Sequence, residues 1–355
     1  MSKQFQGNFF EDFSLGQTIR HGTPRTITEG DVALYIALTG SRFLLHCATP
    51  VAHAMGYREK TVDDLLAFHV AFGKTVPDIS LNAVANLGYA DVRFLQPVYV
   101  GDTLSAESTV IGLKENSSGK NGNVYVRSTA LNQYGEEVLT WVRWVMVNKR
   151  DAASPAPEAV LPELPDHVEV ARLAIPRGLD AADFDTELTG SPHLWEDYTA
   201  GERLDHINGM TVDESDHTLA TKLYQNNARV HFEAHMMAGS RFGRRLMYGG
   251  HVISVCRALS YNGLANALTI AAINGGSHCN PTFAGDTLYA WSEVVEKWEI
   301  PGRSDLGALR VRTYGAKNLD TRDLPAAKVE VEGRQRYHEQ VVLDLDYTVL
   351  MPRRG

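Results

Sequence analysis

The residues best suited to acid–base chemistry lie together in the ten-residue stretch NNARVHFEAH, at positions 226–235. His231 can accept and return a proton near neutral pH, because an imidazole titrates in that range. Asn226 cannot act as a base, since an amide is not basic, but it can orient a water molecule. Glu233 offers a carboxylate, with a solvated helix residue as the alternative interpretation. The stretch is therefore a candidate site for proton transfer to or from a bound molecule.

The same stretch is a weak candidate for a metal site. His231 and His235 are one helical turn apart, but Glu233 between them is expected on the far side of that helix, and no third ligand is identifiable. The chain also has three widely spaced cysteines, Cys47, Cys256 and Cys279. This spacing favours free thiols over a disulfide framework or a metal site. We expect neither a bound metal nor a separate cofactor.

Several other classes of protein are disfavoured. The segment GLKENSSGKNG (112–122) has the wrong spacing for a phosphate-binding loop and carries Asn121 where Ser or Thr is required, so it is predicted to be a hairpin turn. The net charge of -9 argues against a nucleic-acid partner. No apolar run is long enough to cross a bilayer and the N-terminus lacks a signal pattern, which predicts a cytoplasmic protein without a membrane partner.

The elements that position this chemistry come from a duplicated unit. The matching blocks are FFEDFSLGQTI (9–19) with LWEDYTAGERL (194–204), TITEGD (26–31) with TVDESD (211–216), and PVYVGDTLSAESTV (97–110) with PTFAGDTLYAWSEV (281–294). The offset is 185 residues for the Glu-Asp pairs at 11 and 196, and 184 for the GDTL blocks at 101 and 285. A register this constant indicates two copies of one domain.

Each copy is predicted to contain a long apolar helix, at 63–76 in the first copy and 250–268 in the second. The first helix would bury a face made of Leu65, Leu66, Phe68, Ala71 and Phe72. Alternating apolar residues at 123–147 predict a hairpin that turns at Gln133-Tyr134-Gly135-Glu136. Further strands are expected at 308–315 and 339–351 in the second copy.

These elements predict an α+β protein in which each copy packs one long helix on an antiparallel sheet. The N-terminal domain would span 8–150 and the C-terminal domain 193–352. Between them, residues 151–192 are rich in proline and alanine, which is typical of a linker or a wrapping arm. We expect the protein to form a homodimer, because closed twofold assemblies are the commonest.

The two predicted helices begin differently. Asp63 and Asp64 cap the first helix and occupy its positive end. Gly249 and Gly250 leave the second helix open, so that its backbone N–H groups could approach an oxygen that gains negative charge. The alternative is that these glycines only permit a tight turn. The contrast points to the second copy as the working half.

Together, the helix-on-sheet duplication, the His-bearing loop, the glycine pair and the P-x-x-x-GDTL blocks resemble the double-hotdog, MaoC-like (hydratase 2) family of enoyl-CoA hydratases. The resemblance covers roughly residues 8–148 and 193–351. The family motif Gly-Asp-x-Asn-Pro-(Ile/Leu)-His places its His on His231, its Asp on Asn226 and its Pro on Arg229. In the first copy His46 matches the His, while Ser41 and Phe43 replace the Asp and Asn, as in a degenerate half. His46 is then either structural or a remnant of a shared catalytic residue.

The resemblance implies reversible addition of water to the double bond of an enoyl thioester, with coenzyme A present only as part of the substrate. His231 would act as base and acid, assisted by Asn226, and the Gly250 N–H would stabilise the enolate. A substrate with a free carboxylate beside the double bond would need a cation, which Arg229 could supply if it is not a solvated surface residue. We also assign substrate-binding roles to Glu233, Gly249, His251, Arg244 and Arg245, the two arginines as partners of coenzyme A phosphates. The alternatives are a general (R)-specific enoyl-CoA hydratase, a thioesterase and a non-catalytic acyl-CoA-binding hotdog protein.

Overall fold

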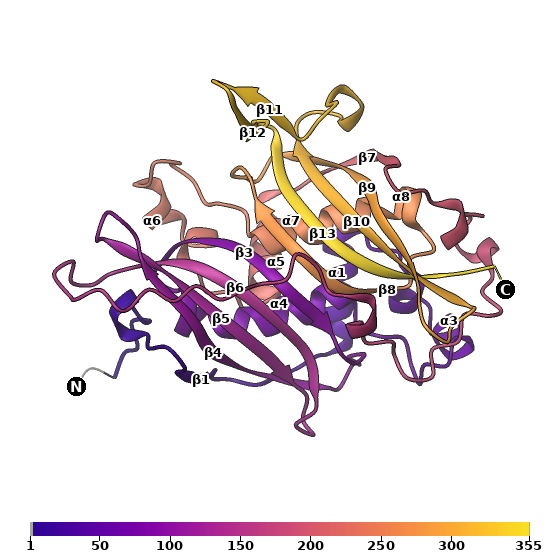
Figure 1. The fold of residues 1–355 in the computed structure, drawn as a ribbon, viewed down its shortest axis with the longest axis horizontal. Helices are drawn as coiled ribbons and strands as arrows, with labels where there is room; N and C mark the ends of the chain where they lie inside the picture. The colour runs from indigo at the N-terminus through magenta and orange to yellow at the C-terminus, as the bar shows by residue number, and fades with distance from the viewer. Residues whose placement is uncertain (1–2, 355) are drawn as a thin grey trace.

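In the computed structural model, which describes residues 3–354, eleven strands form one antiparallel sheet with helices packed behind it in the view of Figure 1. The strands of the first copy are β1 (Thr18–Arg20), β2 (Arg25–Thr26), β3 (Ala83–Phe94), β4 (Thr103–Glu115), β5 (Asn121–Leu131) and β6 (Glu137–Asn148). Those of the second are β7 (Arg203–Thr211), β8 (Thr269–His278), β9 (Thr287–Glu299), β10 (Leu306–Lys317) and β13 (Val341–Pro352). A separate hairpin pairs β11 (Lys328–Val331) with β12 (Arg334–Tyr337).

The sheet repeats the same strand order in both copies. The order β1-β4-β5-β6-β3 of the first half is mirrored as β7-β9-β10-β13-β8 in the second, and β2 pairs with β4. The halves join where β3 pairs with β8, with Tyr89 opposite Gly276 and Val92 opposite Ile273. The duplication detected in the sequence therefore produces one continuous sheet, with its two copies side by side in Figure 1.

The helices show the same twofold plan. They are α1 (Glu29–Thr39), α2 (Leu44–Cys47), α3 (Thr49–Ala54), α4 (Asp64–Thr75), α5 (Glu214–Leu223), α6 (Ala234–Ala238), α7 (Gly249–Leu259) and α8 (Tyr261–Leu264). Shorter helical turns are η1 (Phe10–Asp12), η2 (Val76–Ser80), η3 (Val170–Arg172), η4 (Thr186–Leu188), η5 (Trp195–Asp197), η6 (Arg229–His231) and η7 (Thr321–Asp323). The central helices α4 and α7 meet where His69 Nε2 lies 3.0 Å from Ser254 Oγ, two positions separated by the repeat offset of 185 residues. No helix among residues 3–354 is both long and apolar enough to span a bilayer.

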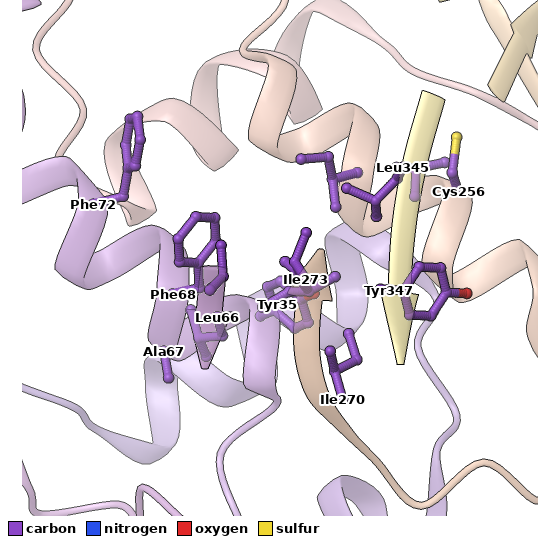
Figure 2. Close-up of a cluster of buried hydrophobic side chains, with 14 of the residues drawn as sticks. Tyr35, Leu66, Ala67, Phe68, Phe72, Cys256, Ile270, Ile273, Leu345 and Tyr347 are labelled. Atoms are coloured by element: carbon purple, nitrogen blue, oxygen red, sulfur yellow. The ribbon is translucent and has the colours of Figure 1, made fainter. Parts of the chain in front are cut away.

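The predicted central helix of the first copy is confirmed as α4. The five side chains expected on its apolar face are all buried, and the remaining residues from Leu65 to Thr75 are buried as well. Burial on every side follows from its position between the sheet and the second copy. At Gly73, for example, an added Cβ would lie 1.9 Å from the carbonyl oxygen of Tyr224. Figure 2 shows Phe68 and Phe72 in a cluster that also includes Ile273 of β8.

The prediction of one continuous helix over 250–268 was wrong. Helix α7 ends at Leu259, and the short α8 contains non-helical backbone at Asn262 and Gly263. Gly263 has a φ of 114°, which an L-residue with a Cβ rarely adopts. The Nδ1 of His206 bonds the carbonyl of Asn262 at 2.6 Å, so the break is fixed by a contact from β7 that the local pattern does not encode.

Both predicted turns are confirmed. Strands β5 and β6 pair as a hairpin around Asn132–Glu136, and residues 116–120 form the turn between β4 and β5. The two GDTL blocks also have a structural role. Gly101 and Gly285 take φ values of 94° and 92°, and the carboxylates of Asp102 and Asp286 each accept a 2.8 Å hydrogen bond from a backbone N–H three residues earlier. These blocks are therefore turns that start β4 and β9.

Residues 151–192 form a wrapping arm that packs on both copies. Beyond η3 and η4, the arm contributes only an isolated bridge between Val160 and Leu113 of β4. The N–H of Val168 bonds Asn274 Oδ1 of β8 at 2.9 Å, and Leu179 is buried. In Figure 1 the arm runs across the face of the sheet opposite the helices. Hydrogen bonds and buried apolar side chains of this kind hold the segment in place without regular secondary structure.

Candidate functional site

A cavity of about 390 Å³ lies between the two copies. The first copy contributes side chains from α4, β3 and β6, and the second contributes the loop before α6, the start of α7 and the end of β8. Polar or aromatic lining residues include Phe72, Asn86, Tyr89, Arg143, Asn226, His231, Arg241, Tyr248 and His278. The cavity thus combines groups that lie more than 180 residues apart in sequence.

His231 lies in this cavity with one ring nitrogen already occupied. Its Nδ1 is 3.0 Å from the carbonyl oxygen of Leu246, which can only accept, so Nδ1 carries the proton and Nε2 is the free base in the neutral ring. Burial lowers the pKa of His231 to about 4, partly offset by the Leu246 carbonyl. His217 Nε2 donates a 2.5 Å hydrogen bond to the His231 carbonyl and so fixes the backbone that carries the ring. The ring is therefore neutral at pH 7 and held in one tautomer.

Asn226 lines the same cavity, and both its backbone and its side chain are held by hydrogen bonds. Its N–H bonds the Thr221 carbonyl at 3.1 Å, and its Oδ1 accepts a 2.9 Å hydrogen bond from the Ala228 N–H. The amide nitrogen is left to face Tyr248, whose hydroxyl pKa is raised by burial and lowered in part by Asn226. The Tyr248 ring packs edge-on against His231, with the ring centroids 5.4 Å apart. Asn226 is thus a fixed hydrogen-bonding group beside the candidate base.

The start of α7 is open, as the glycine pair predicted. Tyr248 is its N-cap residue and provides no side-chain cap, whereas Asp63 caps α4 by accepting a 3.0 Å hydrogen bond from the Leu65 N–H. No backbone carbonyl of residues 3–354 accepts from the N–H of Gly249 or Gly250. Gly249 lines the cavity, whereas Gly250, the next residue, is buried and is not part of the lining. The positive end of this helix therefore faces the cavity wall.

Close packing is the other reason for glycine here. A Cβ on Gly249 would lie 2.4 Å from the His278 ring, and one on Gly250 would lie 2.4 Å from Tyr248 and 2.7 Å from His69. Neither glycine has a positive φ. The requirement is thus for space, so that three rings can approach the first turn of α7.

Sequence reasoning missed His278 and Tyr89. His278 ends β8, and its Nε2 is 3.3 Å from the Tyr89 hydroxyl of the neighbouring strand β3. Burial lowers the pKa of His278 to about 4. The sequence signal that could have indicated His278 is its position three residues before Pro281, the first residue of the second P-x-x-x-GDTL block. The β3–β8 pairing that brings it to the cavity has no local signature.

Arg143 of β6 was also missed. It stands in the apolar run VLTWVRWVMV (138–147), where a charged residue at a buried strand position is unusual and could have been flagged. Its side chain is fully buried, and its Cζ lies 4.2 Å from the centre of the Phe72 ring. The first copy therefore contributes a cation to the cavity that holds His231.

The structure does not bring all the sequence-predicted residues together. Outside the cavity lining are Arg229, Glu233, Arg244, Arg245, Gly250 and His251. Arg229 and Arg244 are exposed, and the Arg244 guanidinium stacks on the ring of Phe283, 4.0 Å from its centre. Arg245 is ion-paired with Glu214. His251 is fully buried in α7, where neither ring nitrogen has a hydrogen-bond partner among residues 3–354.

The expected helix over 226–235 is also absent. Only η6 (Arg229–His231) and α6 (Ala234–Ala238) are helical, and Glu233 is the N-cap residue between them. His231 and His235 therefore do not share one helical face. Within residues 3–354, no group of three or more His, Cys, Asp or Glu side chains is arranged to hold a metal ion.

His46, the counterpart of His231, is buried in a different setting. Its Nδ1 lies 2.9 Å from Thr61 Oγ1, and its Nε2 lies 3.6 Å from Asp64 of α4. Burial lowers its pKa, but the neighbouring carboxylate outweighs that effect and the pKa is raised overall. The side chain is tied to the capped end of α4, consistent with a structural residue in the first copy.

The chain is similar to proteins that carry out hydration or dehydration. A family model described as mesaconyl-CoA hydratase matches residues 2–326. The chain is 59% identical over 354 residues to the beta-methylmalyl-CoA dehydratase of Chloroflexus aurantiacus, covering 100% of this chain and 99% of that protein. It is 55% identical over 349 residues to the mesaconyl-CoA hydratase of Cereibacter sphaeroides, covering 98% of both.

Solved structures give the same picture of the fold. A MaoC domain protein dehydratase from Chloroflexus aurantiacus J-10-fl superimposes with a TM-score of 0.96 at 59% identity and 100% coverage of both chains. A protein of Mycobacterium tuberculosis described as having a double hotdog fold gives a TM-score of 0.77 at 25% identity, covering 98% of this chain and 99% of that one. The predicted double-hotdog, α+β architecture is thus confirmed.

Proposed function

The chain belongs to the mesaconyl-CoA hydratase family and is a hydro-lyase of the hydratase type, and we propose that it interconverts mesaconyl-CoA and β-methylmalyl-CoA. The names of the two relatives that are more than half identical to it support this substrate pair. The single observation that carries the proposal is a neutral, oriented imidazole at His231, in a cavity that also meets the open start of α7.

The proposed addition begins with His231 Nε2 as the base. It takes a proton from a water molecule while the water oxygen forms a bond to the β carbon. The electron pair of the double bond moves toward the thioester carbonyl, so that an enolate develops. The imidazolium then gives its proton to the α carbon, and the thioester bond stays intact. The tautomer fixed by Leu246 supports this assignment because it leaves Nε2 free.

The low pKa of His231 fits a base whose positive charge is stabilised only during the reaction. At pH 7 the ring is neutral and ready to accept a proton. Without substrate, burial disfavours the charged imidazolium form of His231. As the enolate develops, its negative charge favours that form. Stabilisation that appears only with the transition state raises kcat rather than tightening substrate binding.

The enolate oxygen is proposed to bind at the first turn of α7. We assign the Gly250 N–H as its donor, with Gly249 providing the close approach. The free N–H groups at this helix start and the positive end of the helix dipole support the assignment. Asn226 is proposed to orient the attacking water, because its amide is fixed and cannot accept the proton itself.

The test is to supply the purified protein separately with mesaconyl-CoA and crotonyl-CoA, following enoyl-thioester absorbance and free thiol together. We expect absorbance loss with mesaconyl-CoA, slow or no loss with crotonyl-CoA, and no thiol release. Faster loss with crotonyl-CoA would replace the proposal with a general enoyl-CoA hydratase. Thiol release would indicate a thioesterase, and no reaction with either substrate would favour a binding protein.

A further inference from the structure

We propose that Arg143 binds the free carboxylate of the acyl group and thereby selects enoyl-CoA substrates that carry one beside the double bond. This inference rests on the proposed function, since it concerns the same cavity and the same addition of water. It assigns substrate selectivity to a residue of the first copy, whereas the proposed base lies in the second.

Arg143 is a buried cation without an acidic partner among residues 3–354. Its Nη2 donates a 2.8 Å hydrogen bond to Thr75 Oγ1, and its Nη1 lies 3.4 Å from Ser80 Oγ. Both acceptors are neutral, and the guanidinium takes part in no ion pair among residues 3–354. Its Nε has no hydrogen-bond partner among those residues. A buried charge is costly unless it is paired, so this site is electrostatically incomplete without an anion.

Arg143 nevertheless keeps its charge at neutral pH. Burial lowers the pKa of its guanidinium to about 10, partly opposed by the nearby Tyr89 and Tyr248 hydroxyls. At pH 7 the group therefore stays protonated. A fully buried guanidinium can pair with a carboxylate through two parallel hydrogen bonds, a geometry that a lysine cannot reproduce.

A chain of ring contacts connects Arg143 to the proposed base. The guanidinium stacks over Phe72 at 4.2 Å, and the centre of the Phe72 ring is 6.3 Å from that of Tyr248. Tyr248 in turn lies 5.4 Å from the His231 ring. These residues all line one cavity. A substrate that presents its β carbon to His231 would therefore lie in the cavity that Arg143 also lines.

Asn86 supplies a further unpaired polar group. It lies on β3, next to β6, and lines the cavity, and neither atom of its side-chain amide has a hydrogen-bond partner among residues 3–354. Its Nδ2 is suited to donate to a second carboxylate oxygen. By contrast, Arg229 is exposed and lies outside the cavity lining, so an acyl group held there would not meet it. The structure thus favours Arg143 over the arginine that the sequence indicated.

The substrate chemistry matches this arrangement. In mesaconyl-CoA the β carbon carries a carboxylate, and the product keeps that carboxylate beside the new hydroxyl group. 2-Methylcrotonyl-CoA has the same carbon skeleton around the double bond but a methyl group in place of the carboxylate. It is therefore a matched probe for the charge alone. A site that pairs a buried polar group with the substrate strongly rejects an analogue that lacks the partner.

The experiment compares kcat/KM for these two thioesters in the wild type, Arg143→Met and Arg143→Lys. We expect Arg143→Met to lower kcat/KM for mesaconyl-CoA about 100-fold. For 2-methylcrotonyl-CoA we expect kcat/KM to be unchanged or to rise, because no charged contact is lost there and the substitution removes the unpaired cation that disfavours this analogue. Arg143→Lys keeps the positive charge and should show a smaller loss, again confined to mesaconyl-CoA.

The matched control is Arg127→Met, on the adjacent strand β5. Arg127 is ion-paired with Asp91 at 3.0 Å and lies outside the cavity lining, so its loss should not change the ratio of the two kcat/KM values. An equal loss for both substrates in Arg143→Lys or Arg143→Met would overturn the inference while the proposed function stands. A wild type that hydrates 2-methylcrotonyl-CoA but not mesaconyl-CoA would overturn the proposed function, and the inference with it.

Discussion

Replacing Gly249 by alanine tests whether the close approach of His278 to the start of α7 matters for catalysis. The backbone of Gly249 lies outside the left-handed region, so alanine is compatible with its conformation. The added methyl group is the only perturbation. It would lie 2.4, 2.5 and 2.7 Å from three atoms of the His278 ring. Either the ring or the first turn of α7 must then move.

The size of the effect follows from these distances. Ordinary contact with a Cβ begins at 3.4 Å, so the nearest ring atom must retreat by about 1 Å. A 1 Å misplacement in an active site costs about 100-fold in rate. Overpacking of this kind also destabilises the fold by about 1 to 3 kcal/mol, which leaves a domain of ordinary stability folded. We therefore expect a folded variant with kcat lowered about 100-fold.

The assay is the loss of mesaconyl-CoA absorbance under steady-state conditions, together with a thermal unfolding curve. Gly30→Ala is the matched control because Gly30 also lies in the first turn of a helix, α1. There the nearest atom to an added Cβ is Thr28 Oγ1, at an ordinary distance of 3.6 Å. We expect this control to keep wild-type kcat and to gain about 0.5 to 1 kcal/mol in stability.

A Gly249→Ala variant that stayed folded and kept kcat within about threefold of the wild type would refute a catalytic need for this close approach. That need would also be refuted if both glycine variants lost the same fraction of activity. In that case catalysis tolerates a shift of the His278 ring or of the first turn of α7, and the glycine pair would be needed only for the turn before the helix.

Two further predictions concern histidines. We expect His231→Gln to lower kcat by about 10²- to 10⁴-fold with little change in KM, because it removes the proton acceptor and not a binding group. The control is His235→Gln, at an exposed position outside the cavity lining. A loss in kcat below about tenfold for His231→Gln would contradict its assignment as the base. Burial lowers the pKa of His69 and of His251 to about 3 and that of His206 to about 4. Below pH 6.5 these rings take up protons in the unfolded state but stay neutral in the folded state, which favours unfolding. The free energy of unfolding is therefore undiminished by these groups above pH 6.5 and falls as the pH drops toward 3 or 4. Between pH 7.5 and 5.5 the free energy of unfolding should fall by about 1.4 kcal/mol for each of the three. His231 and His278, whose pKa values burial also lowers to about 4, add to the fall in the same direction. The fall is measured by urea denaturation, and an unchanged midpoint with unchanged slope would refute it.

The sequence contained enough local information to predict the repeating unit. Helix α4 and the β5–β6 hairpin follow from side-chain periods of 3.6 and 2, which depend only on neighbouring residues. The constant offset between the two copies predicted the twofold plan, which appears as two matching strand orders. His231, Asn226 and the open start of α7 were predicted for the same reason, because they lie within 25 residues of one another.

The tertiary structure decided which other side chains share the cavity. His278 and Tyr89 meet because β8 pairs with β3, and Arg143 reaches the cavity because β6 pairs with β3 on the other side. Neither pairing leaves a local pattern in the sequence. Arg229 shows the opposite case, because it is two residues from His231 in sequence but is exposed and lies outside the cavity lining, where the chain turns through η6. Nearness along the chain fixes backbone conformation, whereas convergence on a site depends on how separate strands and helices pack.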